Sequence, residues 1–204
     1  MRLWTIQPKE VYEKLLEEKT FRCEKELSEN LTDVGCQDFM KAYDWLVQQM
    51  DKKGIEHPEG VTYPVWAWHT RKWKHTKPDL RYSDYGRRGE HLVCMELEIP
   101  DDQVLLSDFE RWHDVLNNWY SDASTNEEEW EKEHEWYDNL PGEQKNEELL
   151  KSWERIFDLT PIDTDWRANG RYIQAVFWEL KLENIINLTL PMPKGRGFLL
   201  PATT

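Results

Sequence analysis

The sequence predicts an α+β domain with a mixed, mainly antiparallel sheet, several helices and an acidic helical insertion. Strand-like and helix-like patterns follow one another along the 204 residues without the regular β-α-β alternation of a doubly wound parallel sheet. Aromatic residues make up 13% of the chain and include twelve tryptophans, unlike the aromatic-poor composition of disordered proteins. We therefore expect one domain over residues 1–190 and an irregular tail over residues 191–204, which hold three prolines and two glycines.

The first part of the chain predicts one strand and two helices. Residues 3–7 are rich in strand-forming side chains, and Pro8 follows at a first helical position, where its missing N–H costs nothing. Apolar residues then recur at helical spacing to about residue 19 and, more clearly, over residues 36–53. Gly54 provides the stop of the second helix.

A tryptophan-rich strand and a basic loop come next. In residues 61–69, Trp66 and Trp68 face one way, because alternate side chains of a strand share a face. Pro64 cannot donate a ladder hydrogen bond, so this strand is either at a sheet edge or just beginning. Residues 71–89 lack periodicity and predict a long loop, which in a compact domain is usually functional or mobile.

A strong strand and a capped helix follow the loop. Residues 91–99 alternate clearly, and residues 104–106 predict a second, short strand. Ser107 or Asp108 can cap the next helix by accepting a backbone hydrogen bond. The apolar face of that helix consists of Phe109, Trp112, Val115, Leu116 and Trp119.

The last part of the chain returns to strands after a helical block. Residues 121–158 form the acidic insertion, and its clearest helix covers residues 143–157. Residues 172–180 and 185–190 predict two further strands. The sheet is therefore assembled from segments on both sides of the insertion.

Charge is unevenly distributed. The formal net charge is −14, and residues 101–154 hold 17 acidic against 4 basic side chains, a net of −13. Residues 69–91 hold 7 basic against 3 acidic side chains, a net of +4. The overall balance repels phosphate backbones, so nonspecific nucleic-acid binding is not expected. The acidic segment 122–148 is either a solvated helical face or a docking face for a basic protein partner.

Three cysteines at unrelated positions are a poor disulfide framework and indicate reduced thiols. The N-terminus has no apolar run of the signal-peptide type, and no stretch approaches 18 apolar residues. We therefore expect a cytoplasmic protein without a membrane span.

Known catalytic and metal motifs are missing from the sequence. It contains no Walker loop, no GxGxxG and no GxSxG. The six histidines show neither HExxH nor paired CxxC spacing, so we expect no metal. Glu96 and Glu98 share a strand face and, with Asp108, suggest a hydrolase, but they equally suit the solvent face of a half-exposed strand.

Several segments resemble a bacterial and phage domain family of unknown function. They are residues 3–7 (LWTIQ), 63–69 (YPVWAWH), 96–100 (ELEIP) with 107–112 (SDFERW), and 174–180 (QAVFWEL). The resemblance covers nearly the whole chain. It implies a cytosolic prokaryotic or viral setting and supplies no activity.

The order of these segments also resembles the ADP-ribosyltransferase-like fold, which implies NAD as a ligand. By that resemblance Thr5, His69 and Gln174 occupy the catalytic positions. Thr5 stands where the family has Arg or His, and Gln174 stands where it has a catalytic Glu. A glutamine lacks the negative charge that stabilises a developing oxocarbenium ion, so the resemblance implies binding more than transfer.

Two functions follow as hypotheses. In the first, NAD or a related nucleotide lies between the first strand and the tryptophan-rich strand, with Gln174 hydrogen-bonded to its ribose or amide. The aromatic walls and phosphate-binding forks would be Trp4, Trp66, Trp68, Arg71, Arg87 and Arg88. In the second, the protein is not an enzyme and its acidic segment binds or inhibits a basic protein, as in phage–host or toxin–antitoxin pairs. The sequence leaves both open, together with the question of turnover.

Overall fold

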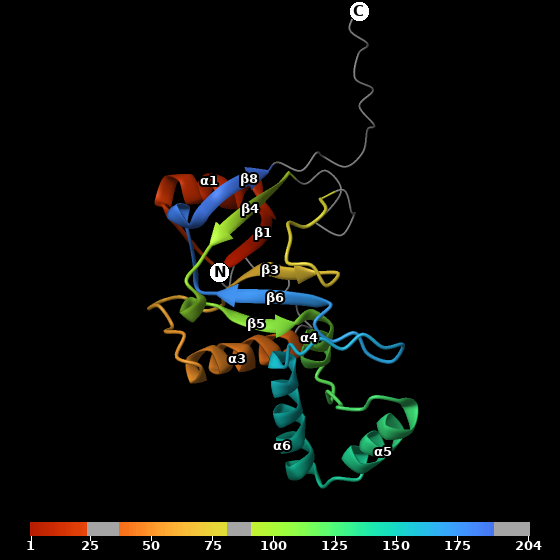
Figure 1. The fold of residues 1–204 in the computed structure, drawn as a ribbon. Helices are drawn as coiled ribbons and strands as arrows, with labels where there is room; N and C mark the ends of the chain where they lie inside the picture. Colours follow the sequence, from red (N-terminus) through yellow and green to blue (C-terminus); the bar gives the residue numbers. More distant parts are fainter. Residues whose placement is uncertain (24–36, 81–90, 190–204) are drawn as a thin grey trace, which may run out of the picture.

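The computed structural model describes residues 1–23, 37–80 and 91–189, which form an α+β architecture (Figure 1). The strands are β1 (Arg2–Pro8), β2 (Thr20–Arg22), β3 (Val65–Arg71), β4 (Leu92–Glu98), β5 (Leu105–Asp108), β6 (Tyr172–Phe177), β7 (Glu179–Lys181) and β8 (Ile185–Thr189). The α-helices are α1 (Lys9–Glu18), α3 (Gln37–Lys52), α4 (Phe109–Leu116), α5 (Glu127–Asp138) and α6 (Gly142–Trp153). Short 3-10 turns cover Asp101–Gln103, Glu154–Phe157 and Leu182–Asn184. The expected tail over residues 191–204 lies outside the described residues.

Six strands form the main sheet in the order β5-β6-β3-β1-β4-β8, and β2 pairs with β7 in a second, two-stranded sheet. Every pairing among these described strands is antiparallel. The α+β class and the mainly antiparallel sheet are thus confirmed. The expected mixture with parallel pairs is not found in the described part of the chain.

The tryptophan-rich strand lies inside the sheet. β3 begins at Val65, directly after Pro64, and runs between β6 and β1. The expectation of a strand start is confirmed, and the alternative of an edge strand is wrong. Proline is tolerated here because it precedes the first ladder position.

The predicted strand over residues 172–180 is two strands. β6 ends at Phe177, and β7 continues from Glu179 in the other sheet. Between them the buried indole of Trp178 donates a hydrogen bond to the Ile55 carbonyl (3.1 Å) and stacks on His57. Trp178, held in this way, marks the point where the chain leaves one sheet for the other. The alternation of side chains over residues 172–180 does not reveal this break.

Two further expectations need correction. Trp119 is not on the apolar face of α4: the helix ends at Leu116, and Asn118 adopts a left-handed backbone (φ 55°) that turns the chain. The Trp119 side chain is 61% exposed as a result. The three-residue strand β2 was not expected, because three residues are too few to establish a period of two.

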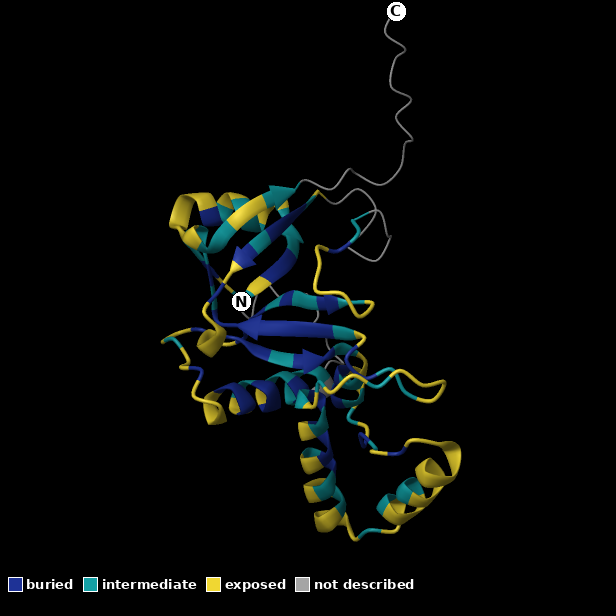
Figure 2. Cartoon of the chain, viewed as in Figure 1, coloured by how far each residue is buried: buried dark blue, intermediate teal, exposed yellow. Residues whose placement is uncertain are grey.

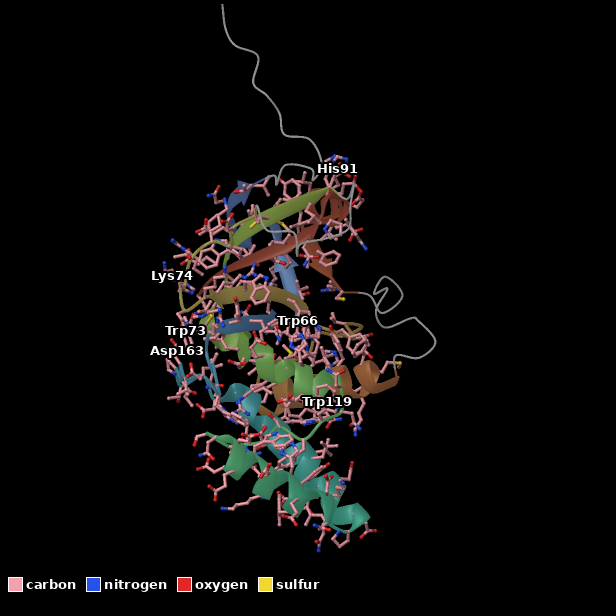
Figure 3. The ribbon with its side chains drawn as sticks, turned by 90° about the vertical axis from the view of Figure 1, so that its right-hand side faces the viewer. Trp66, Trp73, Lys74, His91, Trp119 and Asp163 are labelled. Atoms are coloured by element: carbon pink, nitrogen blue, oxygen red, sulfur yellow. The ribbon has the colours of Figure 1, made fainter. Side chains whose placement is uncertain are left out.

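Apolar side chains cover both faces of the sheet. On one face, α1 contributes Leu15 to a core with Leu3, Ala67 and Met95. On the other face, helices α3, α4 and α6 pack against the strands over a second core. Trp66 packs against that second core and lies in the middle of the molecule, whereas Trp73 projects at one side (Figure 3).

The two helices of the acidic insertion differ in burial. α5 has no buried residue, whereas α6 buries Leu149, Ser152 and Trp153 against the core (Figure 2). The insertion is therefore anchored through α6, and α5 extends into solvent. None of the helices in the described ranges combines the length and apolarity that crossing a bilayer requires.

Candidate functional site

A hollow opens where the main sheet changes direction. Strands β3, β6 and β5 run side by side, and β1, β4 and β8 cross them at an angle (Figure 1). In the described residues, β1 and β3 share one paired position, Trp4 opposite Trp68. Beside this seam lies a pocket of about 730 Å³, which we call the aromatic pocket. It is lined by Ile6, Gln7, Pro8, Tyr43, Trp66, Ala67, Trp68, Arg71, Leu92, Phe109, Glu110, Trp112, Leu116, Tyr172 and Gln174.

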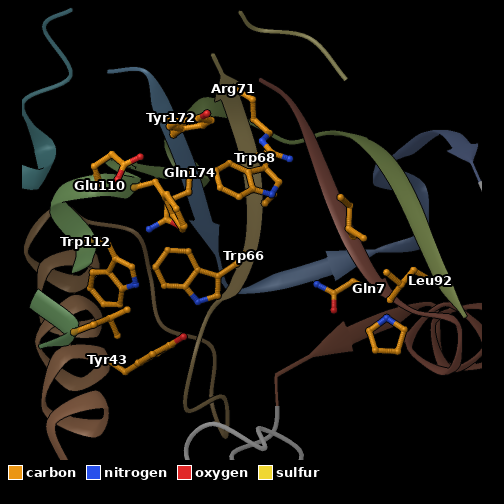
Figure 4. A pocket seen from close by; sticks show the side chains of 15 residues that line it. Gln7, Tyr43, Trp66, Trp68, Arg71, Leu92, Glu110, Trp112, Tyr172 and Gln174 are labelled. Carbon is orange, nitrogen blue, oxygen red and sulfur yellow. The ribbon is translucent and has the colours of Figure 1, made fainter. Parts of the chain in front are cut away.

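Three aromatic rings form the inner end of the aromatic pocket. Trp66 from β3 and Trp112 from α4 have ring centroids 5.2 Å apart. Tyr43 from α3 meets both edge-on, at 5.9 and 5.7 Å (Figure 4). Such edge-to-face contacts hold rings in fixed orientations, so the inner end is a rigid, flat-walled space.

A second group of rings lies at the mouth. Trp68 and Phe109 have centroids 5.0 Å apart. The Arg71 guanidinium stacks over the Trp68 ring at 4.7 Å and approaches the Tyr172 ring at 5.9 Å. A cation held over aromatic faces is fixed in orientation, so the Arg71 guanidinium lies flat beside apolar ring surfaces at the mouth.

Between the two groups of rings lies Gln174 on β6, directly opposite Trp68 on β3. Gln174 is buried, and its Nε2 makes no hydrogen bond within the described part of the chain. The buried Trp66 Nε1 points toward the Tyr43 hydroxyl (Figure 4), and a hydrogen bond between these two side chains opposes the rise that burial causes in the Tyr43 pKa. Buried polar groups are nearly always hydrogen-bonded, so the Gln174 amide calls for an acceptor, which a ligand in the pocket would supply.

The inner end of the pocket is electrically neutral. Burial is the largest cause that raises the pKa of Tyr43 to about 12, so its phenol stays protonated at neutral pH. The charged lining residues are Arg71, which is half-buried at the mouth, and Glu110, which is exposed. A ligand would therefore meet an uncharged interior and a charged entrance.

Thr5 lies buried under the seam and does not line the pocket. Its Oγ1 donates to the Trp66 carbonyl (2.8 Å) and accepts from Nε2 of Gln7 (2.8 Å). Thr5 therefore joins β1 to β3 where their pairing stops, and it orients Gln7, which does line the pocket.

The structure brings together four of the residues expected at the site: Trp66, Trp68, Arg71 and Gln174. Trp4, Thr5 and His69 do not line the pocket. The two remaining candidates, Arg87 and Arg88, lie outside the described residues.

His69 is turned into a separate ring cluster. The register between β3 and β6 shifts between Trp68 and Thr70, and the His69 ring lies 4.1 Å from that of His75. Trp4 contacts His75 in turn, at 5.2 Å. Burial is the largest cause that lowers the pKa of His69 to about 4, followed by the proximity of His75. His69 is therefore neutral at physiological pH, and it does not line the pocket, although its chain neighbour Trp68 does.

Sequence reasoning missed eleven of the fifteen lining residues, among them Gln7, Tyr43, Phe109, Trp112 and Tyr172. Phe109, Trp112 and Tyr43 belong to the apolar faces that the helical spacing predicts. The stripes alone cannot distinguish a ring that fills a core from one that walls a cavity, because both are apolar and inward-facing.

A second, smaller hollow of about 230 Å³ lies along α4 and is surrounded by charged side chains. Asp108 caps α4 by accepting from the Arg111 amide (3.0 Å) and also accepts from the Gly170 amide (2.6 Å). The Arg111 guanidinium donates to Ser121 Oγ (3.0 Å), which donates to Asp114 (2.8 Å). We call this group the Arg111 network.

Burial governs the charges of the Arg111 network. It is the largest cause that lowers the pKa of Arg111, and it raises the pKa of Asp114. Arg167 and Asp122 form an ion pair at 2.7 Å between largely covered side chains. The network ties the segment around Gly170 to α4, and its donors and acceptors satisfy one another.

The carboxylates considered for a hydrolase do not converge. Glu96 on β4 pairs with Arg2 at 3.4 Å, and Glu98 is exposed. Asp108 ends β5, which is separated from β4 in the sheet by β6, β3 and β1. Within the described ranges, no three His, Cys, Asp or Glu side chains gather as metal ligands.

A family model described as a domain of unknown function (DUF3841) matches residues 2–186. No curated protein and no solved structure matches the chain. The expected membership of a family without a known activity is confirmed in this form. The resemblance to the ADP-ribosyltransferase-like fold stays a prediction.

Proposed function

The chain belongs to the family of domains of unknown function DUF3841, and we propose that its aromatic pocket binds NAD or a related nucleotide. The observation that carries the proposal is the amide of Gln174, a buried donor without a partner in the described residues and directed at a cavity walled by rings. Leaving such a donor unpaired costs free energy that a ligand acceptor recovers.

The walls and the mouth support the same ligand class. Flat rings such as Trp66, Trp112 and Trp68 suit stacking of a base or a pyridine ring. Arg71 at the mouth offers a planar fork for a phosphate. A nucleotide combines these two chemistries in one molecule, with its ring inside and its phosphate at the entrance.

We propose that the chain binds a nucleotide, and we do not propose that it transfers ADP-ribose. Gln174 occupies the position at which the ADP-ribosyltransferase-like resemblance expects a glutamate, and Glu179 lies on β7 in the other sheet, paired to Arg22. A neutral amide can hold a ribose or a carboxamide but cannot stabilise a positive transition state by its charge. We propose that this binding takes place in the cytoplasm, where thiols such as Cys23 and Cys94, which form no disulfide within the described residues, stay reduced.

The test is isothermal titration calorimetry with NAD, ADP-ribose and mononucleotides on the full chain. We expect measurable binding, and we expect Trp68→Ala to weaken it by about 10-fold, because stacking on one ring contributes about 1–3 kcal/mol. Trp136→Ala removes a 46% exposed tryptophan on α5 and serves as the matched control with unchanged affinity. Absence of binding at millimolar ligand would refute the proposal.

A second candidate function is docking of a basic protein on α5. This helix carries seven acidic side chains and one lysine, and it has no buried residue. Trp130 and Trp136 are 40% and 46% exposed on it, and exposed tryptophans are frequent anchors of protein interfaces. Negative charge around exposed rings favours a positively charged partner.

Charge reversal on one stripe of α5 tests this candidate. Glu127, Glu131 and Glu135 are exposed and recur every fourth residue, so Lys at all three positions inverts one face while the capping Glu129 stays intact. Association with a basic partner recovered from the host should become slower and less dependent on salt. Recovery of no partner at low salt would end this alternative.

A further inference from the structure

We infer that the aromatic pocket recognises the ribose of its nucleotide through Gln7, whose side-chain oxygen accepts a hydrogen bond from a ribose hydroxyl. The inference rests on the proposed nucleotide binding and specifies the sugar, so that a ribonucleotide binds more tightly than its deoxy analogues. Gln7 contacts the ligand, and Thr5 is a positioning residue that determines which end of the Gln7 amide stays available.

The pocket has a third part besides the inner end and the mouth, where strands β1 and β4 border it. This part is lined by Ile6, Gln7, Pro8 and Leu92, and we call it the seam end. Figure 4 shows Gln7 and Leu92 on one side of Trp66 and Tyr43 on the other. The seam end therefore combines three apolar, non-aromatic side chains with one polar side chain.

A single hydroxyl hydrogen fixes the orientation of the Gln7 amide. The Oγ1 of Thr5 carries one hydrogen and donates it to the Trp66 carbonyl (2.8 Å), which can only accept. Toward Gln7, the same Oγ1 can therefore only accept. The Gln7 atom that lies 2.8 Å from it must be the donor Nε2, and Oε1 is the other end of the amide.

The Oε1 of Gln7 is open to a ligand. Gln7 is half-buried and lines the pocket. Its Oε1 has no hydrogen-bond partner among the described residues and, unlike the Nε2 of Gln174, it is not buried. A carbonyl oxygen has two lone pairs for hydrogen bonds, and a ligand hydroxyl can replace water at such a position. The seam end thus offers an acceptor that is oriented before the ligand enters.

The three parts of the pocket match the three parts of a nucleotide. The rings at the inner end suit the base, and Arg71 at the mouth suits the phosphate. The ribose joins these two groups and is left to face the seam end, where no aromatic ring offers stacking for a second base. Its carbons suit the apolar side chains there, and its hydroxyls are the donors that Gln7 requires.

The experiment compares AMP with dAMP and cordycepin monophosphate, which each lack one of its two ribose hydroxyls, by calorimetry on the full chain. AMP is a small probe that carries a ring, a ribose and a phosphate. We expect at least one deoxy analogue to bind about 5-fold or more weakly than AMP, because it leaves the Gln7 oxygen without its donor. The weaker analogue identifies the hydroxyl that Gln7 accepts from.

Variants of Gln7 and Thr5 assign this ribose ratio, the affinity of AMP divided by that of the weaker deoxy analogue. Gln7→Met keeps the side-chain length and removes the acceptor, so the ribose ratio should fall close to unity. Thr5→Val removes Oγ1 and frees the Gln7 amide to turn, so the ratio should fall partway. Thr5→Ser retains the hydroxyl and should keep the ratio.

Two controls accompany these variants. Gln103→Met makes the same chemical change at an exposed position outside the pocket and should leave the ribose ratio unchanged. Thermal unfolding of each variant establishes that it is folded before titration. Gln7→Met decides the matter alone if Thr5→Val does not fold, because Thr5 is buried and Gln7 is not.

The outcomes separate this inference from the proposed function. If AMP binds but neither deoxy analogue is weaker, or if Gln7→Met keeps the full ribose ratio, the role of Gln7 is wrong and nucleotide binding stands. If NAD or ADP-ribose binds and AMP does not, the match between nucleotide parts and pocket parts is wrong, and nucleotide binding again stands. If none of these ligands binds at millimolar concentration, the proposed function fails, and the role of Gln7 fails with it.

Discussion

Two pockets border helix α4, the aromatic pocket and the hollow around the Arg111 network. They differ in whether their buried polar groups are hydrogen-bonded. In the aromatic pocket, the buried Gln174 Nε2 has no hydrogen-bond partner among the described residues. In the Arg111 network, Asp108, Arg111 and Ser121 are each hydrogen-bonded. A satisfied network stabilises the fold by itself, whereas unsatisfied donors gain a partner only when something enters.

The helical repeat of α4 explains why the two pockets receive different kinds of side chain from it. Phe109 and Trp112 are three residues apart and face the aromatic pocket, whereas Arg111 and Asp114 are also three apart and face the network. One short helix thus supplies rings to one side and charges to the other. The comparison leads us to assign binding to the aromatic pocket and stability to the Arg111 network.

Among the variants considered, Asp108→Ala should lower the free energy of unfolding the most. The substitution removes the N-cap of α4 and leaves the Arg111 and Gly170 amides without their acceptor. Losing a cap costs about 1 kcal/mol, and an unpaired buried amide adds about 1–3 kcal/mol. We expect the free energy of unfolding, measured by urea denaturation, to fall by about 3 kcal/mol.

Asn126→Ala is the matched control, because Asn126 caps the exposed helix α5 by accepting from the Glu129 amide (3.0 Å). It should cost about 1 kcal/mol or less, since no second amide depends on it. If Asp108→Ala and Asn126→Ala lowered the free energy of unfolding equally, the Arg111 network would add nothing to stability. The proposed difference between the two pockets would then be wrong.

Two buried serines test the same contrast more directly. Ser121 and Ser107 are both 0% exposed, but Ser121 Oγ bonds Asp114 and Arg111 whereas Ser107 Oγ has no partner in the described residues. Ser121→Ala should lower the free energy of unfolding by about 2 kcal/mol, and Ser107→Ala should leave it unchanged or raise it slightly. The comparison fails if Ser107→Ala is the more destabilising of the two in urea denaturation.

His69 gives a pH-dependent prediction for a residue outside both hollows. Its folded pKa of about 4 lies below the ordinary 6.5, so the unfolded chain binds the proton first as pH falls. Stability is therefore lost between about pH 6.5 and pH 4. The unscreened shift corresponds to about 3 kcal/mol, and solvent around this half-buried ring reduces it to about 1–2 kcal/mol.

His69→Gln should remove this loss, and the difference between the two proteins should be flat above pH 7. Urea denaturation at a series of pH values measures it. Parallel stability curves for the wild type and His69→Gln across this range would show that the ring is not held neutral by its surroundings. Ligand binding should be unaffected by the substitution, because His69 does not line the pocket.

The sequence was sufficient for the site residues that lie on one strand. Trp66 and Trp68 share a face because of the period of two, and that face is the one that borders the pocket. Local spacing thus predicted this face. In a regular strand Arg71, three residues after Trp68, would face the other way, and the bulge between Trp68 and Thr70 accompanies its stacking on the Trp68 ring.

Features that depend on distant segments could not be predicted in the same way. The bulge between Trp68 and Thr70 accompanies the placement of His69 beside His75, and the break at Trp178 depends on a carbonyl at Ile55. The seam between β1 and β3 arises from the angle between two groups of strands. None of these contacts has a period or motif in the sequence.

The smallest effect is expected on α5, where Trp136→Ala should change the free energy of unfolding by less than about 0.5 kcal/mol. The ring is 46% exposed and touches Tyr120 edge-on at a centroid distance of 6.3 Å. Nucleotide affinity should not change either, because Trp136 lies on α5 and does not line the aromatic pocket. If Trp136→Ala weakened nucleotide binding as much as Trp68→Ala does, a ring outside the aromatic pocket would contribute as much to affinity as one that lines it. The aromatic pocket would then not be the nucleotide-binding site.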